Sequence, residues 1–187
     1  MCIRDSINRE ITYTGAELAP HWIYKNHNLQ GDAIVAFEGK CDVALSEMVD
    51  IADVIENSPI YSERMLNFII EHFNIPLLEG VSRQRLFVCI IKEQVEKATG
   101  LHLERDGDDL FFNGGKLSVS IATKSPTSVL IHTALNIISD NTPVNAAGLS
   151  SEMNFFDIKE LAYSILNAYT KEHEEIIMAS TKVRGVI

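Results

Sequence analysis

Two neighbouring segments in the second half of the chain carry the polar side chains best suited to binding a small ligand. Lys116, Ser118 and Ser120 alternate with apolar residues in the first segment, and His132 and Asn136 share one side of the second. Because alternate residues of a strand point to the same face, each segment presents one polar face if it is a strand. A lysine at the end of such a face can hold a carboxylate or a phosphate.

The loop between these segments decides whether their polar faces coincide. A loop of three or five residues around residues 125–127 sets Lys116 opposite Asn136 and Ser120 opposite His132. A loop of even length would turn one of the polar faces to the other side of the sheet, because a slip of one residue exchanges the faces. We expect the odd loop, since it also places apolar side chains against apolar side chains.

The shared face has two readings, which the residues leave open. It could simply meet water, as one face of many antiparallel sheets does. Ala122 and Ala134 are as small as the serines beside them, and this leaves room for a ligand to lie across the face.

Further candidates lie near the first apolar run of the chain. Gln30 and Asp32 flank Gly31 at the start of this run, and we expect them to make polar contacts with the ligand. Cys41 follows Lys40, and a thiol beside a lysine can be activated as a nucleophile. We favour the simpler reading of Cys41 as a partly buried cysteine at the end of a strand.

The elements that must position these residues are helices and hairpin-linked strands. Strands are predicted over residues 31–37, 101–105, 109–112, 116–123 and 128–138, with Asp-Gly and Asn-Gly turns between three of them. Helices are predicted from Ser82 to Thr99, ended by Gly100, and from Asp157 to about Ala179. Residues 62–74 fit either a helix or a strand buried on both faces, and residues 40–59 are expected to form a long ordered loop. This order predicts an α+β fold with a mixed, mainly antiparallel sheet flanked by helices.

Length and composition place the chain among ordinary globular proteins. Its 187 residues suit one domain, which we expect over residues 7–187. The first six residues, MCIRDS, are similar to a peptide that recurs at the ends of assembled environmental sequences, so we expect a non-native extension there. A net charge of −10 disfavours a nucleic-acid partner, and no run is long enough for a membrane span. Three cysteines without paired spacing, and no secretory signal, favour the cytoplasm.

The segment GGKLSVSIATKSPTSVLIHTALNI resembles a known family. It is similar to the GxKIAxxG…HGxALNV region of lipoyl-(octanoyl-)protein transferases, and more distantly to the KxxGIL…GIGLNV region of biotin-protein ligases. This resemblance covers roughly residues 82–151 and implies the fold that biotin and lipoate ligases share. The whole chain is similar to the domain-of-unknown-function 366 family, which has no settled activity.

The resemblance implies roles for three residues and leaves two functions open. Lys116 matches the lysine that contacts the acyl carbonyl, while His132 and Asn136 match residues that shape the pocket floor. Ala147 stands where octanoyltransferases carry their cysteine, and the GRGRxG and RGGxxxxHGPGQ loops are absent. The first hypothesis is a ligase or acyltransferase acting on a small carboxylic acid or its adenylate, with ATP and magnesium if it is a ligase. The alternative is a non-catalytic protein that binds a small molecule and has lost the reaction. The acceptor protein and the oligomeric state are not specified by the sequence.

Overall fold

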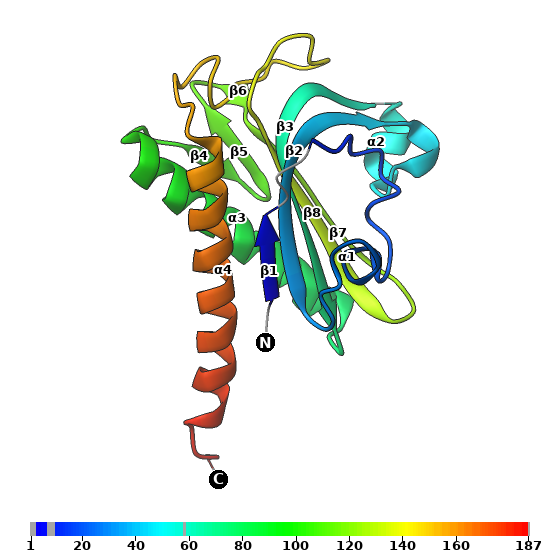
Figure 1. Cartoon of the computed structure of the whole chain (residues 1–187), viewed down its shortest axis with the longest axis vertical. Coiled ribbons are helices and arrows are strands. Elements are labelled where there is room, and N and C mark those ends of the chain that lie inside the picture. Colours follow the sequence, from blue (N-terminus) through cyan, green and yellow to red (C-terminus); the bar gives the residue numbers. More distant parts are fainter. Residues whose placement is uncertain (1–2, 7–9, 58, 187) are drawn as a thin grey trace.

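The computed structural model describes residues 3–6, 10–57 and 59–186, and it has an α+β fold with two sheets (Figure 1). Strands β1, β2, β3, β8 and β7 form the larger sheet in that order, and β4, β5 and β6 form the smaller one. Within the larger sheet only β1 and β2 are parallel, so the sheet is mainly antiparallel, as predicted. The elements are β1 (Ile3–Ser6), α1 (Trp22–His27), β2 (Ala33–Val43), η1 (Leu45–Glu47), α2 (Ile51–Glu56), β3 (Ile60–Phe73), α3 (Leu77–Thr99), β4 (Glu104–Asp106), β5 (Asp109–Phe112), β6 (Gly115–Lys116), β7 (Ser118–Lys124), β8 (Ser128–Asn136) and α4 (Ile158–Thr181).

The ambiguous segment 62–74 lies in the long strand β3, at the centre of the sheet. Phe68 and Ile70 pack in one apolar core with α3 and α4. Met65 and Ile69 pack in a second core, on the other face, with the segment before β2. Both faces of β3 are therefore covered, which explains why its sequence lacks the alternation of a half-buried strand.

The two long helices cover one face of the larger sheet (Figure 1). Helix α3 begins at Leu77, five residues before the predicted start at Ser82, because Pro76 takes the N-cap position. Gly100 ends this helix with a φ of 72°, a conformation that glycine adopts without strain. Helix α4 begins after Asp157, whose carboxylate accepts a hydrogen bond from the amide of Glu160, as the sequence predicted.

The predicted long loop over residues 40–59 is wrong in detail. Strand β2 continues to Val43, and the short helices η1 and α2 occupy most of the remainder. Asp50 caps α2 by accepting from the amide of Ala52, and Asn57 ends it with a φ of 54°. These two local caps let a six-residue helix form where no periodic pattern was visible.

The predicted register of β7 and β8 is also wrong. Lys124 pairs with Val129, so residues 125, 126, 127 and 128 lie between the paired positions and the loop is even. Ser120 consequently pairs with Thr133, and His132 pairs with Ile121. The polar residues of the two strands therefore point to opposite faces of the sheet.

Ile3–Ser6 pairs in parallel with β2 at residues 33–36, although a non-native extension is predicted from the sequence over residues 1–6. No helix in the described ranges is both long and apolar enough to cross a bilayer.

Candidate functional site

A cavity of about 290 Å³ lies at the end of the sheet where β2 stops and β3 begins. Its walls come from segments far apart in the sequence: Tyr13, the η1–α2 segment, the first residues of β3, the β4–β5 turn, both strands of the β7–β8 hairpin and residues 142–146. Val43, Met48, Ile60, Met65, Val119 and Ile121 supply its apolar surface. A cavity of this size and lining can enclose a small organic molecule.

His132 lies at the floor of the cavity and is held as a neutral ring. Tyr13 stacks on it with ring centroids 3.7 Å apart and an interplanar angle of 12°. Asn67 donates to the carbonyl of Met65 through Nδ2, so its Oδ1 accepts from His132 Nε2 at 3.1 Å. Burial lowers the pKa of His132 to about 3. The proton therefore sits on Nε2, and Nδ1 keeps a lone pair that can accept a hydrogen bond.

Ser62 gives the cavity wall a buried hydroxyl without a partner. The residue is 2% exposed, and its Oγ makes no hydrogen bond with any described residue. Leaving a buried polar group unpaired costs about 1–3 kcal/mol, and native proteins rarely tolerate it without a reason. A bound molecule with a polar group at this position would supply the missing partner.

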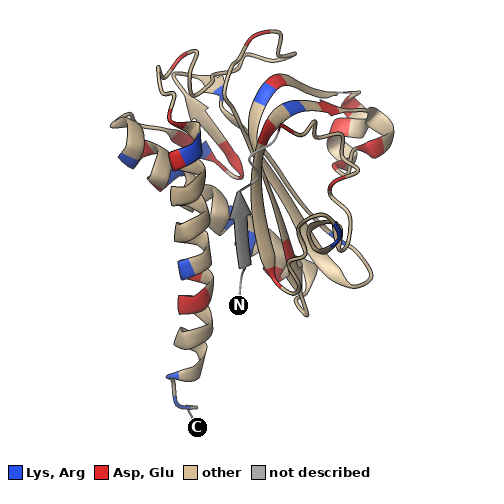
Figure 2. Cartoon of the chain, in the orientation of Figure 1, with Lys and Arg blue, Asp and Glu red and all other residues tan. Residues whose placement is uncertain are grey.

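The mouth of the cavity carries an excess of negative charge. Glu47, Asp50, Asp53, Asp108 and Asp109 line it, whereas Lys116 is the one basic residue among the described lining residues. Figure 2 shows acidic residues gathered around α2, on this side of the molecule. The pKa of Asp53 is raised by burial and by the neighbouring carboxylate of Asp50, although Lys116 acts in the opposite direction.

The positive charge of Lys116 is paired with a carboxylate within the protein. Its Nζ lies 2.9 Å from an oxygen of Asp109, and about a third of its side chain is exposed. Arg85 pairs in the same way with Asp108 at 3.3 Å. Asp53 and Glu47, by contrast, make no ion pair within the described part of the chain. The electrostatic field at the mouth is therefore set by carboxylates rather than by the lysine.

Comparison with known proteins places the chain in a family. A family model described as Domain of unknown function (DUF366) matches residues 3–184. The chain belongs to this family. An uncharacterised protein from Methanocaldococcus jannaschii is 38% identical over 176 residues, which cover 91% of this chain and 79% of that protein. A solved structure from Pyrococcus horikoshi, of a protein of unknown function, has a TM-score of 0.93 at 36% identity, and all of both chains is covered.

More distant solved structures show the fold of this DUF366 protein. The biotin protein ligase of Aquifex aeolicus with biotin and ATP has a TM-score of 0.62 at 12% identity, covering 92% of this chain and 71% of that one. A T. acidophilum protein with bound lipoic acid, named as a candidate lipoate protein ligase, has a TM-score of 0.61 at 12% identity, covering 93% and 86%. The fold is therefore that of biotin and lipoate ligases, as the resemblance implied.

The structure brings five of the seven predicted site residues to this cavity. Lys116, Ser118, Ser120, His132 and Asn136 all line it. The predicted register is wrong, so these residues do not share one polar face of the sheet. They reach the cavity from both faces, at the edge strand β7. Asn136 uses its Nδ2 to donate to the carbonyl of Lys116 at 3.2 Å, which fixes the backbone beside the lysine.

The two serines of β7 have structural partners. Ser118 Oγ accepts from the amide of Leu110 at 2.8 Å. Ser120 Oγ accepts from Gln84 at 3.0 Å and shares a hydrogen bond with Thr133 at 2.8 Å. The polar face of β7 therefore has hydrogen-bond partners in β5, α3 and β8. The even loop allows these bonds, because it turns the serines toward those elements.

The remaining predicted residues lie elsewhere. Gln30 is exposed and outside the cavity, and Asp32 lies at the opposite end of β2, beside His72 and His173. Cys41 is fully buried, and burial raises the pKa of its thiol to about 12, so it stays protonated and unreactive. Ala147 is buried as well, at the position where the resemblance would require a thiol.

Sequence reasoning missed Ser62, Asn67, Tyr13 and Asp53. Asn67 interrupts the apolar run from Met65 to Ile70, and this contrast was the available signal, whereas Ser62 lies beside the charged Glu63 and Arg64 and did not stand out. Tyr13 and Asp53 carried no comparable signal, because segments without a periodic pattern bring them to the cavity.

Proposed function

We propose that this protein binds a small organic molecule with an elongated apolar body and a neutral or positively charged polar end. The apolar walls of the cavity would enclose the body, and Ser62 and His132 would contact polar groups along it. The protein acts in this proposal as a binding module of the ligase fold. The carboxylate-activating reaction of the ligases is not part of it.

The observation that carries this proposal is the buried hydroxyl of Ser62, which lines the cavity and has no hydrogen-bond partner among the described residues. Beside it, neutral His132 retains one acceptor nitrogen, and the stacked ring of Tyr13 keeps the imidazole in place. A ligand that donates to His132 and bonds Ser62 would satisfy two buried groups at once. Such convergent polar groups in an apolar cavity are typical of small-molecule sites.

Charge decides which ligands fit. A free carboxylate entering the mouth would meet five acidic residues and one lysine, whose amine is already paired with Asp109. The same five carboxylates would attract a protonated amine, and a neutral end would be neither attracted nor repelled by them. Attraction between unit charges a few ångströms apart near a protein surface is worth a few kcal/mol, so this balance is sufficient to select ligands.

Lys116 supports a second candidate, a ligase or acyltransferase acting on a small carboxylic acid. The residue lines the cavity, and a cation there can stabilise negative charge that develops on a carbonyl or phosphate oxygen. This function requires Lys116 to leave Asp109, and ATP would need magnesium to enter the acidic mouth. We favour the binding module, because the lysine is paired and Ala147 offers no nucleophile.

Probes of equal length and different charge test the proposal directly. We expect octylamine and octanol to raise the melting temperature of the protein more than octanoate does, at concentrations below self-association. A probe at a hundredfold over its dissociation constant stabilises by about 2.7 kcal/mol, which is easily measured. Biotin, lipoate and ATP with magnesium are the probes for the ligase candidate.

Two variants separate the candidates. Lys116→Ala leaves the unliganded protein nearly as stable and, in the binding proposal, strengthens octylamine binding because it removes a positive charge. In the ligase candidate the same variant abolishes the stabilisation by acids. Stronger binding of octanoate, biotin or lipoate than of octylamine, dependent on Lys116, would overturn the binding proposal, as would the absence of any stabilisation by all the probes.

A further inference from the structure

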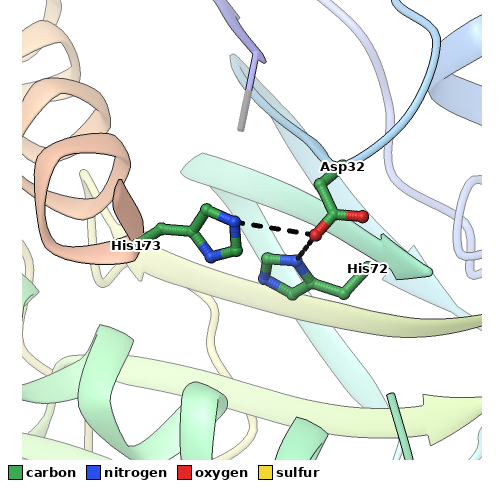
Figure 3. A group of neighbouring side chains, drawn as sticks. All are labelled: Asp32, His72 and His173. Atoms are coloured by element: carbon green, nitrogen blue, oxygen red, sulfur yellow. Dashed lines mark hydrogen bonds and ion pairs between the residues drawn. The ribbon is translucent and has the colours of Figure 1, made fainter. Parts of the chain in front are cut away.

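We propose that Asp32, His72 and His173 form a binding site for a divalent transition-metal ion, such as Zn²⁺. The three side chains converge at the end of β2 and β3 that is opposite to the cavity (Figure 3). One aspartate and two neutral imidazoles are a donor set that Zn²⁺ prefers, and three protein ligands leave a further position open.

The distances between the donor atoms suit one shared ion. Asp32 Oδ2, His72 Nδ1 and His173 Nε2 all lie within 4.8 Å of one another. Asp32 Oδ2 is 2.8 Å from His72 Nδ1 and 3.7 Å from His173 Nε2. Tetrahedral ligands of Zn²⁺ lie roughly 3.3 Å apart, so side-chain movements of about an ångström or less complete the site.

His173 supplies the observation that points to a missing partner. The residue is 3% exposed, and its Nε2 has no hydrogen bond with any residue in the described ranges. At 3.7 Å, Asp32 Oδ2 is too far away to accept one. Figure 3 shows the ring directed toward Asp32, so an ion between them would give this buried nitrogen a partner.

Surrounding groups already orient two of the three ligands. The amide of Phe73 donates to Asp32 Oδ1 at 2.9 Å, which leaves Oδ2 for the ion. Tyr169 Oη lies 2.7 Å from His72 Nε2. When His72 binds the ion through Nδ1, the proton of the imidazole moves to Nε2. The N–H at Nε2 can then donate a hydrogen bond to Tyr169 Oη. Such outer partners fix ligand orientation in metal sites.

Solvent can reach the site from one side. His72 and His173 are buried, but a fifth of the Asp32 side chain is exposed. An ion would enter from this side, and a water molecule would approach it there as the fourth ligand.

Arg83 opposes the ion and sets how tightly it binds. Its Nη1 lies 2.5 Å from His173 Nδ1, and since arginine only donates, the proton of this imidazole sits on Nε2. Binding an ion at Nε2 moves that proton to Nδ1 and displaces Nη1. Arg83 can retain its two other bonds, from Nε and Nη2 to Glu79 at 3.0 and 2.6 Å.

Arg83→Gln therefore gives the sharpest test. Glutamine removes the positive charge and can accept the Nδ1 proton of His173, so we expect Zn²⁺ to bind about tenfold more tightly than to the native chain. The experiment is titration of the chelator-stripped, full-length protein with Zn²⁺, followed by calorimetry. Titration with Co²⁺ adds an absorption spectrum that reports nitrogen and oxygen ligands directly.

We expect one equivalent of metal per chain, with binding lost in His72→Gln and His173→Gln. His102→Gln is the matched control, because His102 is exposed and paired with Glu96, outside the cluster. Circular dichroism shows whether each variant is folded, and Arg83→Gln keeps all three ligands. The proposal is overturned if the native chain and Arg83→Gln both fail to bind Zn²⁺ or Co²⁺. It is also overturned if binding survives in the two histidine variants, or if Arg83→Gln binds more weakly.

Discussion

The cavity and the Asp32 cluster occupy opposite ends of the β2–β3 pair, and they use buried polar groups differently. In the cluster, Asp32 and His72 are fixed by short hydrogen bonds to Phe73, Tyr169 and each other. In the cavity, Ser62 Oγ has no hydrogen-bond partner among the described residues, and His132 bonds Asn67 through Nε2. We therefore expect changes in the cluster to alter stability strongly, and changes in the cavity to alter ligand binding more than stability.

Removing the carboxylate of the cluster tests this contrast most strongly. Asp32→Ala leaves the buried N–H of His72 and the amide of Phe73 without an acceptor, so we expect a loss of about 2–4 kcal/mol in the free energy of unfolding. Urea denaturation measures it. Asp42→Ala is the control, because that exposed carboxylate forms a surface ion pair with Lys40 and should change stability by less than about 1 kcal/mol. A loss no larger than that of the control would show that the cluster does not hold this end of the sheet.

His132 in the cavity couples the stability of the protein to pH below neutrality. His132 is neutral in the folded protein because burial lowers its pKa to about 3, whereas in the unfolded chain it titrates near 6.5. Its contribution is present above pH 6.5 and is lost as the pH falls toward 3, because the unfolded chain takes up the proton first. At pH 5 the loss is on the order of 2 kcal/mol.

The measurement is the free energy of unfolding at several pH values between 7.5 and 5. His132→Gln removes this titration and should flatten the decrease relative to the native chain. An unchanged slope would mean that His132 is accessible to protons in the folded state, and that the cavity is wetter than its lining indicates.

Ser118 lies on the cavity wall but belongs with the structural hydroxyls. Its Oγ accepts from the buried amide of Leu110, so Ser118→Ala should cost about 1–2 kcal/mol of stability. Ser82→Ala on the exposed face of α3 is the control, with no measurable cost expected. Chemical denaturation compares the free energies of unfolding of the two variants. If these are equal, Ser118 is not needed for stability and is again a candidate ligand contact.

The smallest effect on stability is expected at Ser62. Ser62→Ala removes an unpaired buried hydroxyl, so stability should stay constant or rise by up to about 1 kcal/mol, while binding of the octyl probes weakens. Ser128→Ala is the matched buried serine, because its hydroxyl donates to buried Glu71 at 2.6 Å and its loss is destabilising. If thermal melts show that Ser62→Ala is destabilised as much as Ser128→Ala, the hydroxyl has a partner, and the main support for the binding proposal is lost.

Local sequence determined much of the framework, because its signals act over a few residues. The Asp-Gly and Asn-Gly turns predicted the hairpins, with Gly107 and Gly114 at φ of 63° and 79°. Gly100 and Asp157 marked helix ends that the structure confirms. Lys116, His132 and Asn136 line the cavity, although the register from which they were selected is wrong, and their contact with a ligand stays a prediction.

Tertiary structure decided the rest. Residues 62–74 became a strand because cores on both sides cover it, and no local period records such burial. The register of β7 and β8 followed from partners for Ser118 and Ser120 that lie in β5, α3 and β8. Asp32, His72 and His173 are up to 141 positions apart in the chain and meet only because β2, β3 and α4 pack together. Contacts between residues so far apart in the chain depend on how whole helices and strands pack together. The local secondary-structure preferences of the residues do not specify this packing.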